Sequence, residues 1–169
     1  MSNRLKVTAL VLLLVVGVAW YAFRPERAFI NQTVNEQFPT TAAASNKLAS
    51  GQFHSGAHET RGTASVFQLA DGKKTLRLTE FATSNGPDVH VYLVAAPDAK
   101  DNDTVTKAEF VDLGSMKGNI GDQNYELPAN ADLAKYRAVT IWCKRFNANF
   151  GTAPLMPSTA VAMQSTNMQ

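Results

Sequence analysis

Short segments in which apolar and polar side chains alternate follow one another through most of the chain. Within 138–146 (AVTIWCKRF) one strand face carries Val139, Ile141 and Cys143, and the other carries Trp142 and Lys144. Segments of this kind occupy 63–70, 75–81, 89–95, 109–113, 125–127, 138–146 and 147–155. Turn signals separate them at the spacing of about 8–12 residues that is typical of all-β domains. The sequence predicts an antiparallel β-sandwich or barrel of about seven to nine strands.

Three connections between these strands carry their own signals. We expect a polar loop over 97–104 and one helical turn over 128–136, beginning at Asp132. The glycine-rich segment 114–124 lacks the Gly-Lys-Ser/Thr ending of a phosphate-binding loop, so it is interpreted as a hairpin or surface loop.

The N-terminus contains a nearly uninterrupted apolar run, Val7–Phe23, flanked by basic residues. Its length is close to that of a membrane-spanning helix, which predicts a signal anchor with the rest of the chain outside the cytoplasm, in the periplasm or at the cell surface. The alternative is a signal peptide cut before Trp20, after the small residues Gly17 and Ala19, which would give a secreted protein.

The chain therefore divides into four predicted parts. Residues 1–24 form the anchor, 25–46 a linker with one short helix over 27–37, 47–156 the β-domain, and 157–169 a disordered tail.

Composition excludes several classes of function. A net charge of +2 without a dense Lys/Arg stripe argues against nucleic-acid binding. The single cysteine excludes an intramolecular disulfide. The sequence has neither a Gly-x-Ser-x-Gly nor a His-Glu-x-x-His motif, so we do not expect a stand-alone enzyme.

Several motifs between Leu48 and Leu155 together resemble the DM-thirteen family. They are Gly51-Gln52-Phe53, His58 with Gly62-Thr63-Ala64, the strand 76–81, Asn85-Gly86-Pro87-Asp88 leading into Val91-Tyr92-Leu93, Asp112-Leu113-Gly114, Lys117-Gly118, Gly121-Asp122-Gln123-Asn124-Tyr125, and 139–146 with Phe150-Gly151. The resemblance implies a small extracytoplasmic module that acts in electron transfer with a redox partner protein. It also implies that one cysteine, here Cys143, works as a bare thiol or binds a prosthetic group such as haem.

The main candidate site residue is Cys143, and four other residues are candidates to act with it. His58 is the first histidine candidate and His90 the second, and together with Cys143 they offer thiolate and imidazole ligands for haem iron or copper. Trp142 could stack a ligand, and Asp88 is either a binding residue or the cap of a turn. No Cys-x-x-Cys-His motif is present, which excludes covalent c-type haem.

Three functions remain open from the sequence, the least favoured of which is an enzyme whose substrate pocket the sequence does not reveal. In the first, Cys143 is the redox or ligand residue of an electron-transfer module. In the second, Cys143 packs in the core as a small apolar residue, and the chain is a non-catalytic envelope-binding module that uses the loops Ser84–Asp88 and Gly114–Asn124.

Overall fold

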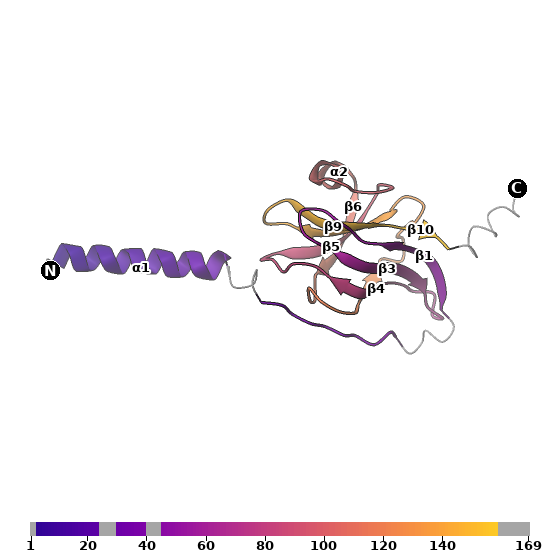
Figure 1. Ribbon diagram of the computed structural model, residues 1–169, viewed down its shortest axis with the longest axis horizontal. Coiled ribbons are helices and arrows are strands. Elements are labelled where there is room, and N and C mark those ends of the chain that lie inside the picture. Colours follow the sequence, from indigo (N-terminus) through magenta and orange to yellow (C-terminus); the bar gives the residue numbers. More distant parts are fainter. Residues whose placement is uncertain (1–2, 24–29, 40–44, 159–169) are drawn as a thin grey trace, which may run out of the picture.

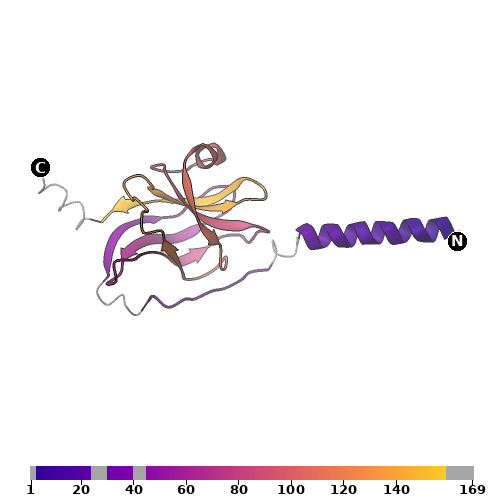
Figure 2. The same ribbon diagram turned by 180° about the vertical axis from the view of Figure 1, so that it is seen from behind.

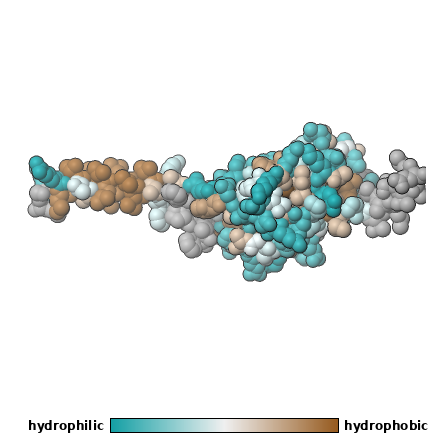
Figure 3. All heavy atoms as spheres, turned by 90° about the horizontal axis from the view of Figure 1, so that it is seen from above, coloured by the Kyte–Doolittle hydropathy of each residue, from teal (hydrophilic) through white to brown (hydrophobic). Residues whose placement is uncertain are grey.

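A computed structural model of the chain describes residues 3–23, 30–39 and 45–158. One helix, α1 (Asn3–Phe23), projects from a β-domain (Figure 1). At a rise of about 1.5 Å per residue it is long enough to cross the roughly 30 Å hydrocarbon core of a bilayer. Among the described residues none of the span Asn3–Ala22 is buried, and Figure 3 shows this apolar rod beside a largely hydrophilic domain. The helix fits either a single-pass anchor or a signal sequence.

The β-domain is a sandwich of two five-stranded sheets in which all neighbouring strands are antiparallel. The strands are β1 (Asn46–Gln52), β2 (His54–Ser55), β3 (Arg61–Gln68), β4 (Lys74–Ala82), β5 (Val89–Val94), β6 (Phe110–Ser115), β7 (Gln123–Leu127), β8 (Ala138–Cys143), β9 (Ala148–Pro154) and β10 (Met156–Pro157). One sheet has the order β10-β1-β3-β4-β7 and the other β2-β9-β8-β5-β6. The predicted all-β sandwich is confirmed. The described residues form ten strands rather than seven to nine, because β2 and β10 have only two residues each.

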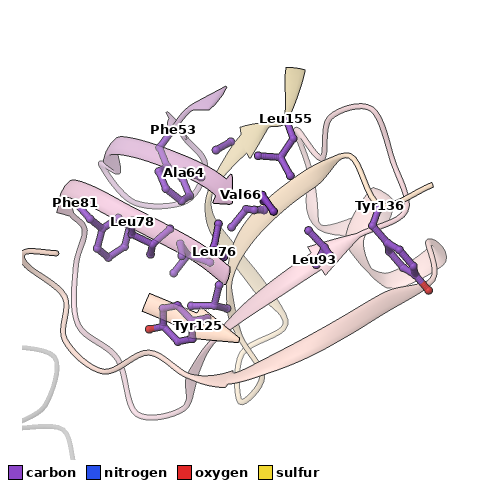
Figure 4. Close-up of a cluster of buried hydrophobic side chains, with 14 of the residues drawn as sticks. Phe53, Ala64, Val66, Leu76, Leu78, Phe81, Leu93, Tyr125, Tyr136 and Leu155 are labelled. Atoms are coloured by element: carbon purple, nitrogen blue, oxygen red, sulfur yellow. The ribbon is translucent and has the colours of Figure 1, made fainter. Parts of the chain in front are cut away.

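The main core fills the space between the two sheets, as Figure 4 shows for side chains from both of them. Val139, Ile141 and Cys143 on β8 are fully buried in it, on the face that the alternation predicts. Leu76 and Leu78 of β4, which belongs to the other sheet, line the opposite side of this core. Burial of these apolar side chains is the main force that holds the two sheets together.

A second, smaller core covers the outer face of β5 and β8. Tyr92 and Trp142 lie in it together with Val105, the one buried residue of α2 (Asn102–Lys107). The polar loop expected over 97–104 is therefore wrong in its second half, where α2 begins. The Asp101 side chain accepts a 2.7 Å hydrogen bond from the Thr104 backbone N–H, which caps a helix too short to show a clear period.

Residues 30–39, which we name the strap, run extended along the side of the domain (Figures 1 and 2). Val34 N donates to Ile120 O at 2.9 Å and Glu36 N donates to Asp122 O at 2.9 Å. The short helix expected over 27–37 is absent from its described part, 30–37, and residues 27–29 lie outside the described residues. Backbone pairing with the segment before β7 favours the extended form.

Candidate functional site

Three loops and the start of the strap meet at one end of the sandwich, which we name the anchor-side end. The loops are 83–88 between β4 and β5, 116–122 between β6 and β7, and 144–147 between β8 and β9. Asn85 Nδ2 donates to Ile30 O at 3.0 Å, and Arg145 Nη1 donates to Ala22 O of α1 at 2.6 Å. The two ribbon views agree that α1 leaves the domain from this end (Figures 1 and 2).

Cys143 lies at the anchor-side end, as the last residue of β8. It pairs with Val89 on β5 and with Ala148 on β9, and its exposed fraction is 0%. Its side chain belongs to the main core, where a thiol behaves as a small apolar group. A reagent in solution reaches this thiol only when the end of the sandwich opens.

Phe150 and Gly86 close the core beside Cys143. A register shift on β9 leaves Phe150 without a partner on β8, and this bulge lets its ring enter the core. A Cβ added to Gly86 would lie 2.8 Å from Val89 Cγ2 and 3.3 Å from Phe150 Cζ, so the loop 83–88 sits directly on these two residues. Glycine is required here for the close approach of the loop.

His58 lies against the same aromatic ring. Its imidazole and the Phe150 ring have centroids 3.9 Å apart, and His58 N donates to Phe150 O at 3.3 Å. His58 is therefore at the anchor-side end, as a neighbour of the ring that packs in the core with Cys143.

His90 occupies the outer face of the same sheet. Its Nδ1 lies 2.9 Å from Asp112 Oδ1 and its Nε2 lies 3.2 Å from Asp88 Oδ1. Val89 is paired with Cys143 and shares its inward face, so the next residue, His90, points away from the thiol. The structure thus joins His90 with Asp88 but does not bring His90 to Cys143.

The carboxyl of Asp112 is electrostatically coupled to this group. Burial raises its pKa, but hydrogen bonds from His90 and from the Gly114 backbone N–H, together with the charges of His90 and Lys144, outweigh burial and lower the pKa overall. Lys144 Nζ lies 3.5 Å from Asp112 Oδ2. Asp112 was not among the candidates from the sequence, although its place beside His90 follows from the pairing of β5 with β6.

Trp142 lies in the second core and stacks on Tyr92. Its ring centroid is 6.3 Å from that of Tyr92, which itself stacks on Phe110 at 4.4 Å. Burial, followed by the negative charges of Asp112 and Asp88, raises the pKa of the Tyr92 hydroxyl.

The structure does not bring the predicted ligands Cys143 and His90 to one metal ion. Cys143 faces the core, His90 faces the opposite side of the sheet, and His54 Nε2 is bound to Asp98 Oδ1 at 2.8 Å. Among the described residues, His, Cys, Asp and Glu side chains nowhere converge in a group of three or more suited to a metal ion. A copper ion needs several such donors around one point, whereas a haem iron needs only an axial side chain that faces a pocket, and Cys143 faces the packed core instead.

A cavity of about 440 Å³ opens at the anchor-side end. It is lined by Asn85, Gly86, Pro87, Asp88, Val89, Ser115, Met116 and Lys117, with Ile30 and Gln32 of the strap. The two loops that the sequence marked as candidate binding loops therefore share one cavity. The strap completes its wall, and no signal in the sequence indicated that contribution.

Buried amides and a charged pair fix the strap and the loop 116–122. Asn119, 1% exposed, accepts from Gln32 N at 2.7 Å and donates to Thr83 O at 2.9 Å. Glu36 Oε1 lies 2.7 Å from Lys117 Nζ. Burial raises the pKa of Glu36, but the hydrogen bonds from Lys117 and Asn124 and the charge of Lys117 lower it overall.

Together these features define a β-sandwich domain behind an apolar N-terminal helix, with one buried thiol at the end nearest that helix. The family model described as electron transfer DM13 matches residues 52–155, and the chain belongs to this family. The family's name connects the domain with electron transfer. Neither the curated proteins nor the solved structures contain a significant match to the chain.

Proposed function

We propose that the chain is a single-pass membrane protein whose β-domain lies outside the cytoplasm and serves as an accessory module in electron transfer. The family match supports the electron-transfer role, and α1 supports the anchor. The observation that carries the proposal is the position of Cys143, the only thiol, at the end of a central strand on the side nearest α1. Cys143 is the proposed redox residue, and His58 is its proposed neighbour.

The chemistry open to one thiol without a bound metal is exchange with a disulfide of a partner protein. The Cys143 thiolate attacks one sulfur of that disulfide, a new S–S bond forms, the old one breaks, and the departing sulfur takes up a proton. A thiol of a second, dithiol protein then attacks the partner's sulfur in the mixed disulfide and releases Cys143 as a thiol, and the other thiol of that dithiol displaces the partner's sulfur. Two electrons thus pass from the dithiol, which becomes a disulfide, to the partner's disulfide, which becomes a dithiol, and Cys143 is regenerated.

Burial controls this proposed exchange. The thiol must become accessible through local opening of the loop 83–88 or the hairpin 144–147, since Gly86 and Phe150 cover the core beside it.

The second candidate function is a binding module in which Cys143 is structural. The cavity of about 440 Å³ between the two candidate loops favours it, because this volume lies in the range of small-molecule sites. Its polar wall, with Asp88 and Ser115, suits a small polar ligand.

Thiol kinetics on the full chain in detergent separate the two functions. We would follow the reaction of Cys143 with dithionitrobenzoate in the native protein and in denaturant, with Cys143→Ser as the blank. Native reaction that exceeds the rate set by global unfolding supports a redox thiol behind a local opening. Reaction only through global unfolding favours the structural cysteine. A visible spectrum before and after dithionite on the same sample tests for haem or copper, and a band lost in Cys143→Ser would contradict the metal-free mechanism.

Location is tested separately. Protease added to intact spheroplasts should remove the β-domain and leave α1 in the membrane. A β-domain that the protease does not cleave would contradict the extracytoplasmic location, and this result would leave the proposed thiol chemistry untested and unchanged.

A further inference from the structure

We propose that the anchor-side end of the domain docks on the surface of the membrane that α1 spans, with Phe146 and Ile30 inserted at the headgroup level and Lys144 against lipid phosphates. The inference rests on the membrane-anchor part of the proposed function and is independent of the redox role of Cys143.

The length of the chain between helix and domain limits how far this end can lie from the membrane. Seven peptide units join Phe23, the last residue of α1, to Ile30, the first described residue of the strap. A fully extended chain covers at most about 3.6 Å per residue, so Ile30 lies within about 25 Å of the end of the helix.

Because the strap is fixed to the domain, the limit on the distance between Ile30 and α1 also restricts how the domain is oriented on the membrane. Gln32 N is held by the buried Asn119, and Glu36 is held by Lys117 and by the Asn124 backbone N–H at 2.8 Å. The strap thus belongs to the rigid body of the domain and does not act as a free tether. The anchor-side end is the end that faces the bilayer, while β10 lies at the other end (Figure 1).

Apolar side chains project from this end into solvent. Phe146 is 62% exposed and Ile30 is 60% exposed. Phe146 is at the tip of the hairpin 144–147, where Asn147 takes the left-handed conformation with φ of 48° that closes the turn. Exposed apolar side chains at a membrane-facing end are suited to the boundary between headgroups and acyl chains.

Charge at the hairpin agrees with an anionic lipid surface. The Lys144 side chain is 44% exposed and Arg145 lies next to it, so two cations precede Phe146 in the hairpin. The carboxyl of Asp112 is shared between Lys144, whose Nζ lies 3.5 Å from Oδ2, and His90, whose Nδ1 lies 2.9 Å from Oδ1. A cationic loop with an aromatic tip combines electrostatic attraction to lipid phosphates with apolar insertion.

The contact between the hairpin and α1 selects the membrane over a protein partner. Arg145 Nη1 donates to the carbonyl of Ala22 in the last turn of α1. The tip of the hairpin is therefore at the level where the helix emerges from the bilayer, which is the level of the lipid headgroups.

Depth measurements on the full chain in nanodiscs test the proposal. The chain with Cys143→Ala receives a nitroxide at Phe146→Cys or, as the matched control, at Met156→Cys, which is 63% exposed at the opposite end. Collisions with oxygen report lipid and collisions with a water-soluble nickel chelate report water. We expect a several-fold higher ratio of oxygen to nickel collisions at position 146 than at 156, reduced when anionic lipid is omitted or Lys144→Glu is added.

The possible failures are distinguishable. A chain that does not co-elute with the nanodisc contradicts the anchor. A chain that co-elutes but gives equal ratios at 146 and 156 overturns docking and leaves the anchor intact. Protection at position 146 that appears only after other membrane proteins are added also overturns it, in favour of a protein partner.

Discussion

His90 Nδ1 lies 2.9 Å from Asp112 Oδ1, and the two residues fasten β5 to β6 on the outer face of the sandwich. The other ring nitrogen of His90 approaches Asp88, whose backbone carbonyl accepts from Lys144 N at 2.9 Å. One imidazole therefore connects the cavity loop, the edge strand β6 and the hairpin that we propose to face the membrane.

Replacing Asp112 should weaken this connection in a pH-dependent way. The pKa of Asp112 is lower in the folded protein than its ordinary value near 3.8. Its contribution to stability is therefore present above about pH 4 and is lost as pH falls through the folded-state pKa. For Asp112→Asn we expect a free energy of unfolding about 1 kcal/mol lower at pH 7, since solvent partly screens the site. Urea unfolding from pH 2 to 8 measures it.

A matched control for this change is Asp103→Asn, which breaks the exposed pair with Lys107 on α2. Exposed pairs of this kind contribute little. An equal effect of both substitutions, or a difference from the wild type that persists unchanged at pH 2, would contradict the role given to Asp112.

Gly86→Ala should open the route to Cys143. The added methyl would meet Val89 Cγ2 and Phe150 Cζ, so the loop 83–88 must move outward. We expect a loss of about 1–3 kcal/mol, the usual cost of overpacking, and a faster reaction of the Cys143 thiol with dithionitrobenzoate. Val66→Ala is the control, because it weakens the core from β3 without touching this loop. If the two variants react equally fast at equal stability, the loop does not control access.

Alternation and turn chemistry were enough to predict the sandwich. Leu76 and Leu78 of β4 are buried while Arg77 between them is not, as the pattern required. Asp71-Gly72 closes the β3–β4 hairpin with Gly72 at φ 83°, and Tyr136 N donates to Asp132 O at 2.8 Å in the expected helical turn. These features depend on local sequence, which is why they can be read without the structure.

Features that depend on distant contacts could not be predicted in this way. The strap is extended because Val34 and Glu36 pair with residues more than 80 positions away, and its own sequence shows no strand period. The same holds for the candidate site. Alternation predicted the faces of Cys143 and His90 correctly, but the burial of Cys143 under Gly86 and Phe150 depends on a bulge and a loop that only the fold brings together.

Removal of the strap should destabilise the domain. We compare a chain that begins at Ile30 with one that begins at Lys47, which keeps every strand from β1 onward except its first residue. Without the strap, Asn119 Oδ1 loses the hydrogen bond that it accepts from Gln32 N, and Lys117 loses its ion pair with Glu36. Several hydrogen bonds worth about 1 kcal/mol each disappear, so we expect a loss of roughly 2–4 kcal/mol in urea unfolding.

Glu36→Gln in the longer chain provides the comparison for the strap. It should lose part of this stability, since the neutral amide keeps the shape of the side chain but not its attraction to Lys117. Equal stability of the chains that begin at 30 and at 47 would show that the strap is a passive linker after all.

Tyr125 should give the domain an alkaline limit of stability. Burial raises the pKa of its hydroxyl to about 12, and the negative charge of Glu36 adds to this, while the hydrogen bond from the Lys117 backbone N–H opposes it. Because the folded pKa exceeds the unfolded value near 10, the contribution of Tyr125 is complete below pH 10 and is lost as pH rises toward 12. In Tyr125→Phe, Gln123 Oε1 also loses its 2.8 Å hydrogen bond from the hydroxyl, which we expect to cost about 1 kcal/mol at pH 7. Urea unfolding between pH 7 and 11 should therefore show a less steep loss of stability above pH 10 in the variant than in the wild type. Parallel curves for the two proteins would mean that Tyr125 does not set the alkaline limit.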